Sequence, residues 1–210
     1  ERRPLPMLQT AACLFTLAAL AIQGALEPSQ GPPEETVTVH PVYSSAPSDE
    51  AVQRLMSKVG PSCCTSHEEG GCIECTFEVA VNSSRIEWGD KGLDDEDAVV
   101  VAHVIRNSPI LMILHLGANA IGDKGASALG ELLGNSAVPL KWLSVQGNAI
   151  TFDGAEDIAR GLKNPDAAQR MLSLDLSGNA IGMGYDNGCV ALAAAFTASP
   201  PEKLVTLNLV

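Results

Sequence analysis

Aromatic residues are scarce in this sequence, and its charge is mostly of one sign. Phe, Trp and Tyr together make up 4% of the 210 residues, whereas aliphatic residues and glycine are plentiful. A core built from Leu, Ile, Val and Ala favours a regular, repeated lattice over the varied packing of a globular enzyme. The formal net charge is −12, and nucleic-acid-binding domains usually present a basic face. We therefore expect no nucleic-acid partner; the acidity serves solubility or matches a basic partner surface.

Motifs of catalysis are also missing. The His-Glu-Glu stretch at residues 67–69 lacks the second histidine that a zinc protease helix requires. His115 with Asp175 or Glu87 is the candidate for acid–base chemistry, yet no nucleophile, metal pair or glycine-rich phosphate loop accompanies these residues in the sequence. We therefore expect a protein without enzymatic activity and without a cofactor.

Residues 1–26 contain a hydrophobic segment. Two arginines precede a stretch without charge from Pro4 to Leu26. One interpretation is a cleaved signal peptide, with Gly24 and Ala25 as the small residues near the cut. The other is a retained membrane anchor, because residues 5–26 just reach the ~20 apolar residues that a spanning helix requires. Both place the rest of the chain in a translocated compartment, lumenal or extracellular; a buried helix of a cytosolic protein is the less favoured alternative.

A linker and a cap follow the hydrophobic segment. Residues 27–47 contain five prolines among Ser, Thr and Glu, which forbids a long helix and favours an extended, acidic spacer. Ser48 then offers a helix N-cap, and apolar residues such as Leu55 fall on one face until Gly60 stops the pattern. We assign residues 48–82 to an N-terminal cap that begins with this short amphipathic helix.

Four of the six cysteines lie close together in the cap, at positions 63, 64, 72 and 75. Adjacent cysteines seldom bond to each other because the geometry is strained. The favoured interpretation is therefore two disulfides that join Cys63 and Cys64 to Cys72 and Cys75, in one of two pairings. The alternative is a zinc site of Cys64, His67, Cys72 and Cys75, in which a CxxH pair and a CxxC pair each chelate the ion.

The rest of the chain, residues 83–210, repeats itself. Three segments obey the pattern LxxLxLxxNxI, with other aliphatic residues or Met replacing some of the leucines. An earlier, degenerate segment surrounds Ile86 and Trp88, and a last one begins at Leu204, which gives four repeats and the opening strand of a fifth. The three complete sets are Leu111, Leu114, Leu116, Asn119 and Ile121; Leu140, Leu143, Val145, Asn148 and Ile150; and Met171, Leu174, Leu176, Asn179 and Ile181.

Each repeat predicts one short strand and one helix. The alternating leucines make a strand with one face inward, and a glycine such as Gly125 precedes apolar residues four apart, here Leu129 and Leu133, that make a helix facing the same core. Neither element can bury its apolar face alone, so several copies must stack. The repeated Asn can satisfy backbone groups in the bend, which an aliphatic residue could not do.

The repeated pattern resembles the leucine-rich repeats of the ribonuclease-inhibitor type. The resemblance implies an α/β solenoid, with parallel strands on a concave face and helices on a convex face, to which we add the N-terminal hydrophobic helix and the small Cys-rich cap. It also implies that the concave face binds another protein. One relative class, the Ran GTPase-activating proteins, assists catalysis on this scaffold, but the sequence offers no matching basic motif to carry over.

Strand residues between the inward leucines are expected on the concave face. Ile113 beside Trp142 would form an apolar pair on an otherwise small and polar sheet, and an exposed Trp is a common interface anchor. The alternative is that Trp142 packs on its strand neighbours with no partner. The candidate partner-binding residues are Trp142, Ile113, His115, Ser144, Asp175, Arg85 and Glu87, with Ser173, Thr206 and Asn208 at the equivalent positions.

These features together predict a non-catalytic protein-interaction module. We expect a membrane-anchored accessory or docking subunit of a larger membrane assembly, for example a respiratory or photosynthetic one. The alternative is a secreted recognition or inhibitor-type protein. The sequence stops on a strand, so we expect either a fragment or a partner that covers the open C-terminal end. Asn82 begins a glycosylation sequon that is usable only on the secretory route.

Overall fold

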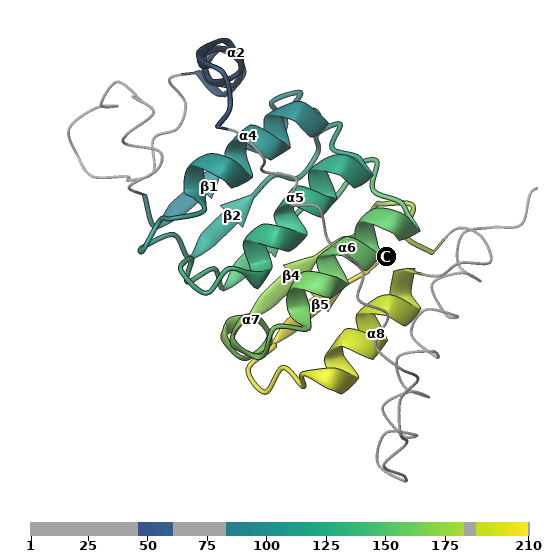
Figure 1. Cartoon of the computed structure of the whole chain (residues 1–210). Coiled ribbons are helices and arrows are strands. Elements are labelled where there is room, and N and C mark those ends of the chain that lie inside the picture. The colour runs from purple at the N-terminus through teal and green to yellow at the C-terminus, as the bar shows by residue number, and fades with distance from the viewer. Residues whose placement is uncertain (1–45, 61–82, 183–187, 210) are drawn as a thin grey trace, which may run out of the picture.

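The computed structural model describes residues 46–60, 83–182 and 188–209 (Figure 1). The hydrophobic segment, the linker up to residue 45, both alternatives for the cysteine cluster, and Asn82 lie outside these described residues. Within the described residues, no helix has the length and apolar character needed to cross a membrane. The same part of the chain contains no group of His, Cys, Asp or Glu residues arranged to hold a metal ion.

Five short strands form one parallel sheet in chain order. The strands are β1 (Arg85–Glu87), β2 (Ile113–His115), β3 (Trp142–Ser144), β4 (Ser173–Asp175) and β5 (Thr206–Asn208). They pair without any shift in register, so the middle residue of each strand faces the middle residue of the next, as in Leu114 opposite Leu143. The predicted strand of each repeat is therefore present, and equivalent side chains form continuous rows across the sheet.

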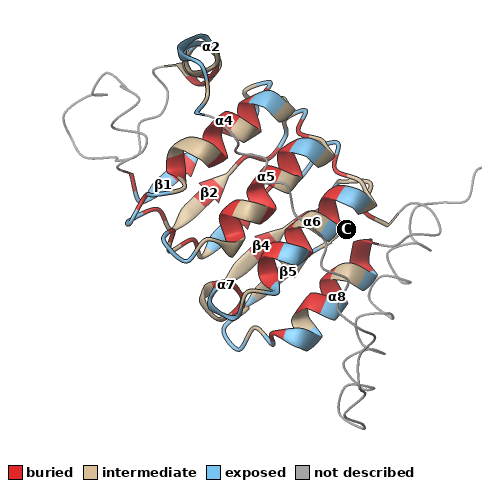
Figure 2. Ribbon diagram, in the orientation of Figure 1, coloured by how far each residue is buried: buried red, intermediate tan, exposed pale blue. Residues whose placement is uncertain are grey.

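The described helices cover one face of this sheet, and none of them covers the other (Figure 1). They are α4 (Asp95–Ile105), α5 (Asp123–Gly134), α6 (Phe152–Leu162) and α8 (Gly188–Ala198), with a short α7 (Pro165–Arg170) after α6. Buried residues recur along each of the four long helices (Figure 2). The close approach of α5 and α6 depends on glycine, because a Cβ added to Gly161 would lie 2.1 Å from the carbonyl oxygen of Gly130.

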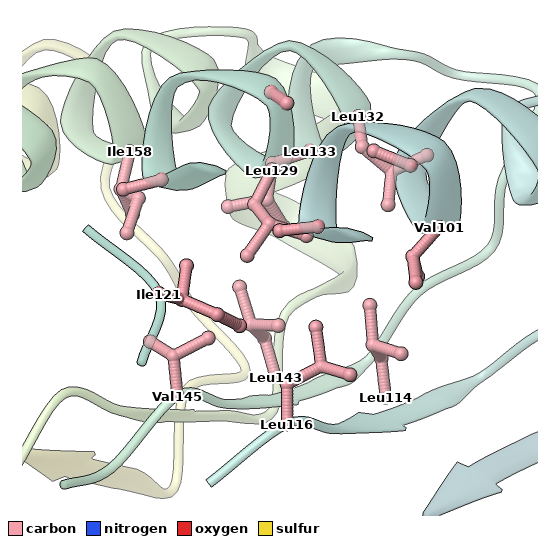
Figure 3. Close-up of a cluster of buried hydrophobic side chains, with 14 of the residues drawn as sticks. Val101, Leu114, Leu116, Ile121, Leu129, Leu132, Leu133, Leu143, Val145 and Ile158 are labelled. Atoms are coloured by element: carbon pink, nitrogen blue, oxygen red, sulfur yellow. The ribbon is translucent and has the colours of Figure 1, made fainter. Parts of the chain in front are cut away.

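The core lies between the sheet and the helices. Figure 3 shows strand residues such as Leu114 and Leu143 pointing toward helix residues such as Leu129, Leu133 and Ile158, all of which are at most 1% exposed. Burying one such side chain contributes about 1.5–3 kcal/mol. A single turn offers too few of these contacts for stability, so the core is shared by successive turns.

The repeated asparagines tie consecutive turns together. Asn148 donates from Nδ2 to the carbonyl oxygen of Leu116 in the preceding turn, at 3.0 Å, and to that of Val145 in its own turn, at 2.9 Å. Asn179 makes the equivalent pair of bonds one turn later, and Asn119 one turn earlier. The prediction that these side chains satisfy backbone groups in the bends is confirmed, and the three asparagines are in register.

Aspartate side chains make a second tie at the helix N-termini. Asp95 Oδ1 accepts from the amides of Gly122 and Gly125, at 2.8 and 2.7 Å, where the next helix begins. Asp123 does the same for the start of α6. Gly125 permits this contact, because a Cβ at that position would lie 2.9 Å from Asp95 Oδ1 and 2.6 Å from an Ile121 methyl carbon. The glycine that recurs after each Asn is therefore a packing requirement.

Helix α2 (Asp49–Val59) packs against α4 at the first turn of the stack. Ser48 is its N-cap and accepts from the Ala51 amide at 3.2 Å, so the predicted cap helix is present. Its Arg54 and Lys58 form ion pairs with acidic residues at the start of α4, including the fully buried Asp97. Asp97 occupies the position that glycine takes in later turns, and its carboxylate pairs with Arg54 and Lys58 of α2.

Candidate interaction surface

The uncovered side of the sheet is built from the first and last residue of each strand. Because strand side chains alternate, these residues point away from the helices when the middle residue points into the core. We call this surface the helix-free face. Its first row is Arg85, Ile113, Trp142, Ser173 and Thr206, and its second row is Glu87, His115, Ser144, Asp175 and Asn208.

A hollow of about 390 Å³ lies on the helix-free face. All seven predicted partner-binding residues line it, together with Ser173, Gln146 and the two central strand leucines at positions 114 and 143. The parallel register explains this gathering, because residues about 30 positions apart in the chain become neighbours on adjacent strands. Thr206 and Asn208, which share the face, do not line the hollow.

Trp142 and Ile113 form the apolar part of this surface. They are register partners on β3 and β2, and Trp142 is 37% exposed while Ile113 is half-buried. The other tryptophan, Trp88, is only 4% exposed and belongs to the core. Partly exposed tryptophan side chains beside a hollow are frequent anchors of protein interfaces.

Arg85 and Glu87 are paired with each other. Both lie on β1, and the Arg85 guanidinium contacts a carboxylate oxygen of Glu87. Both side chains are about half exposed, so this ion pair contributes at most about 1 kcal/mol to stability. Its main consequence is electrostatic, because the two charges cancel at this edge of the hollow.

Asp175 is the carboxylate at the opposite edge. Its Oδ1 accepts from the hydroxyl and amide of Ser177, at 2.6 and 3.0 Å, and its Oδ2 accepts from the Asn208 side chain at 3.2 Å. Desolvation raises the pKa of Asp175, but these hydrogen bonds and the nearby His115 charge outweigh it, and the pKa lies below its ordinary value. Asp175 is therefore ionised at neutral pH.

His115, Ser144 and Asp175 stand next to one another in the second row. Ser144 is the register partner of both other residues and lies between them. A catalytic Ser-His-Asp relay requires the histidine in the middle, where it can contact both partners. The imidazole instead packs over Gly89, where an added Cβ would come within 2.9 Å of His115 Cε1. This arrangement favours binding over acid–base catalysis.

Two features of the hollow were not identified in the sequence. Gln146, one residue past the inward Val145, extends toward β2 so that a Cβ on Gly117 would lie 2.7 Å from its Cγ. The repeat alignment contains a signal for this residue, because Gln146 is long and polar where the equivalent residues of the neighbouring turns are the small Gly117 and Ser177. The second feature is Ser144 Oγ, which is buried and has no hydrogen-bond partner among the described residues.

Comparison with known families identifies part of the repeat. Residues 107–130, which include β2, Asn119 and most of α5, match the family model described as Leucine Rich repeat. A search of curated proteins found no match to the chain. The chain thus contains a leucine-rich repeat, and five parallel strands alternating with helices agree with a solenoid of such repeats.

Proposed function

We propose that this chain is a non-catalytic protein-interaction module that docks its partner on the helix-free face, with Trp142 as the anchor. The observation that carries the proposal is the exposed Trp142 beside Ile113 at the hollow. Burying an exposed Trp in a partner supplies a large apolar contribution from one rigid side chain. Leucine-rich-repeat domains are typically non-catalytic, which agrees with the order of His115, Ser144 and Asp175.

Site-specific photocrosslinking tests this proposal. A photoreactive phenylalanine analogue is placed at Ser173 on the helix-free face, or at Glu156, which is exposed on α6 on the opposite side. We expect defined protein adducts from position 173 and none from position 156 when the full chain is expressed in its source cells. Adducts from position 156 alone would contradict the proposal.

Two substitutions distinguish a specific role of Trp142 in partner binding from a general effect of exposed apolar side chains. Trp142→Ala removes the proposed anchor, and Val190→Ala shortens another exposed apolar side chain, 44% exposed on α8. Hot-spot aromatic residues contribute at least about 2 kcal/mol to binding, so we expect the Trp142→Ala adduct yield to fall about tenfold or more. Val190→Ala should leave it unchanged. Equal yields from both variants would remove Trp142 from the site.

We further propose that the module works in a translocated compartment. In one version the hydrophobic segment stays as an anchor and the protein is an accessory subunit of a membrane assembly; in the other it is cleaved and the protein is secreted. The support for both is the uncharged stretch from Pro4 to Leu26 after two arginines. Sequencing the N-terminus of the mature protein separates them, because a start near Ala25 excludes the anchored version.

The proposed compartment favours two disulfides for the cysteine cluster. Thiol titration and metal analysis of the purified full chain test this. Disulfides predict that Cys63, Cys64, Cys72 and Cys75 react with a thiol reagent only after reduction. The zinc alternative predicts one bound zinc ion per chain and thiols that react once a chelator removes the metal.

A further inference from the structure

We propose that the hollow of the helix-free face receives a basic side chain, Arg or Lys, from the protein partner, with its cation held between the Trp142 indole and the Asp175 carboxylate. This inference rests on the proposed function and deepens it, because it names the chemistry of the group that docks.

Trp142 and Asp175 are diagonal neighbours on the helix-free face. Trp142 pairs in register with Ser173 on β4, and Asp175 lies two residues further along the same strand on the same face. Adjacent strands lie about 4.8 Å apart and two residues along a strand span about 6.6 Å, so diagonal neighbours are about 8 Å apart, within reach of long side chains. Both line the same hollow. A guanidinium or ammonium group placed between them can contact the aromatic ring and the carboxylate together.

The charges around the hollow leave one carboxylate without a cationic side chain in direct contact. Glu87 is paired with Arg85, whereas Asp175 accepts hydrogen bonds only from Ser177 and Asn208 among the described residues. His115 also lines the hollow and acts electrostatically on Asp175, but no hydrogen bond or ion pair joins the two side chains among the described contacts. Asp175 therefore remains open to a stronger, permanently charged donor.

Other occupants fit this surface less well. An acidic side chain would meet the Asp175 carboxylate within a chain of net charge −12. An aliphatic side chain would cover Trp142 but would bring no hydrogen-bond donor for Asp175. A basic side chain suits both Trp142 and Asp175, since its stem packs on the indole while its head donates hydrogen bonds to the carboxylate.

Nuclear magnetic resonance titration of the full chain tests the inference with a defined probe. The probe is the blocked peptide acetyl-Gly-Ser-Arg-Ser-Gly-amide, and its matched control carries citrulline, which has nearly the shape of arginine but no charge. We expect the arginine peptide to shift the Trp142 indole resonance and the amides of Ser144 and Asp175. The citrulline peptide should bind about tenfold more weakly, as expected when a charge-assisted hydrogen bond is lost.

Variants of equal charge change assign the effect to Asp175. Asp175→Asn should weaken binding of the arginine peptide about tenfold, whereas Glu156→Gln, on the exposed side of α6, should leave it unchanged. Trp142→Leu is a second variant that keeps the carboxylate and removes the ring, and it should weaken binding as well. The dispersion of each variant's spectrum shows whether it is folded.

The contrary results are equally defined. Equal binding of the arginine and citrulline peptides, no binding of either, or equal effects of Asp175→Asn and Glu156→Gln would overturn the inference. Crosslinks from position 173 would still support the proposed function in each case. If position 173 gives no crosslinks, the proposed function itself is contradicted, regardless of whether the arginine peptide binds.

Discussion

The side-chain amide of Asn148 lies 3.0 Å from the carbonyl oxygen of Leu116, and this hydrogen bond joins two consecutive turns of the chain. The same side chain accepts from the Ile121 amide at 3.0 Å and donates to the Val145 carbonyl at 2.9 Å. An amide side chain has both donors and an acceptor, whereas a carboxylate only accepts and an aliphatic group does neither. Asn is thus the residue that can close one turn while fastening it to its neighbour.

Replacing Asn148 with Ala should destabilise the whole stack. The change leaves the Ile121 amide and the Leu116 carbonyl without the asparagine, and each unsatisfied buried group costs about 1–3 kcal/mol. We expect the free energy of unfolding to fall by about 3 kcal/mol in urea titrations followed by circular dichroism. Asn107→Ala, at an exposed turn residue after α4, should change it by less than about 0.5 kcal/mol. Equal losses would show that Asn148 has no special role.

The helix contact at Gly161 predicts opposite effects for two identical substitutions. Gly161→Ala would place a Cβ 2.1 Å from the Gly130 carbonyl oxygen, so α5 and α6 must separate, at a cost of about 2–3 kcal/mol. Gly134→Ala meets no atom closer than 3.7 Å and should stabilise the protein by up to about 1 kcal/mol. Thermal unfolding of both variants checks this. A tolerated Gly161→Ala would mean that the two helices are further apart.

Much of the fold could be predicted from the sequence because its signals recur in phase. Apolar residues two apart specify a strand, those four apart specify a helix, and Asn with Gly marks the bend between them. Helix α7 did not show in this pattern, since Pro165–Arg170 is less than two turns long. The pattern predicts α2 as a cap helix but not its contacts, because Arg54 bonds residues more than 40 positions away and no local period encodes such a pair.

The candidate site could be predicted only in part. Strand alternation alone decides that Trp142 and Asp175 face away from the helices, and the succession of repeats places them on adjacent strands. The side-chain conformations that join Arg85 to Glu87 and aim Gln146 at Gly117 depend on packing in three dimensions. Sequence reasoning therefore identified the surface, but not which of its charges are already compensated.

The buried carboxylate of Asp97 should matter more than its exposed neighbour. Asp97→Ala removes the partner of Lys58 and Arg54 at the contact between α2 and α4, and we expect a loss of about 2–3 kcal/mol. Glu96 also pairs with Arg54, but its side chain is 66% exposed, so Glu96→Ala should cost no more than about 0.5 kcal/mol. Urea unfolding of both variants measures the difference. Equal effects would mean that burial adds nothing to this contact.

Asp175 should make the stability depend on pH. Its pKa is lower in the folded chain than in the unfolded chain, so its stabilising contribution is present above the ordinary pKa of about 3.9 and is lost as the pH falls through the folded pKa. Asp175→Asn should therefore lower the urea midpoint at pH 7 and have a smaller effect at pH 3. Glu156→Gln is the control. If the loss of stability caused by Asp175→Asn grew as the pH falls, the pKa of Asp175 would not be lowered by folding, and this account would be contradicted.

Hydrogen exchange at the amides of Ile121 and Ile150 tests the central claim most directly. Both residues lie in bends outside any helix or strand, where amides ordinarily exchange fast. In the stack they donate to the side chains of Asn148 and Asn179, each from the following turn. We predict protection comparable to that of the strand residue Leu143. Rapid exchange at both amides, with Leu143 still protected, would show that the turns are not fastened into one stack, and the helix-free face would lose its basis.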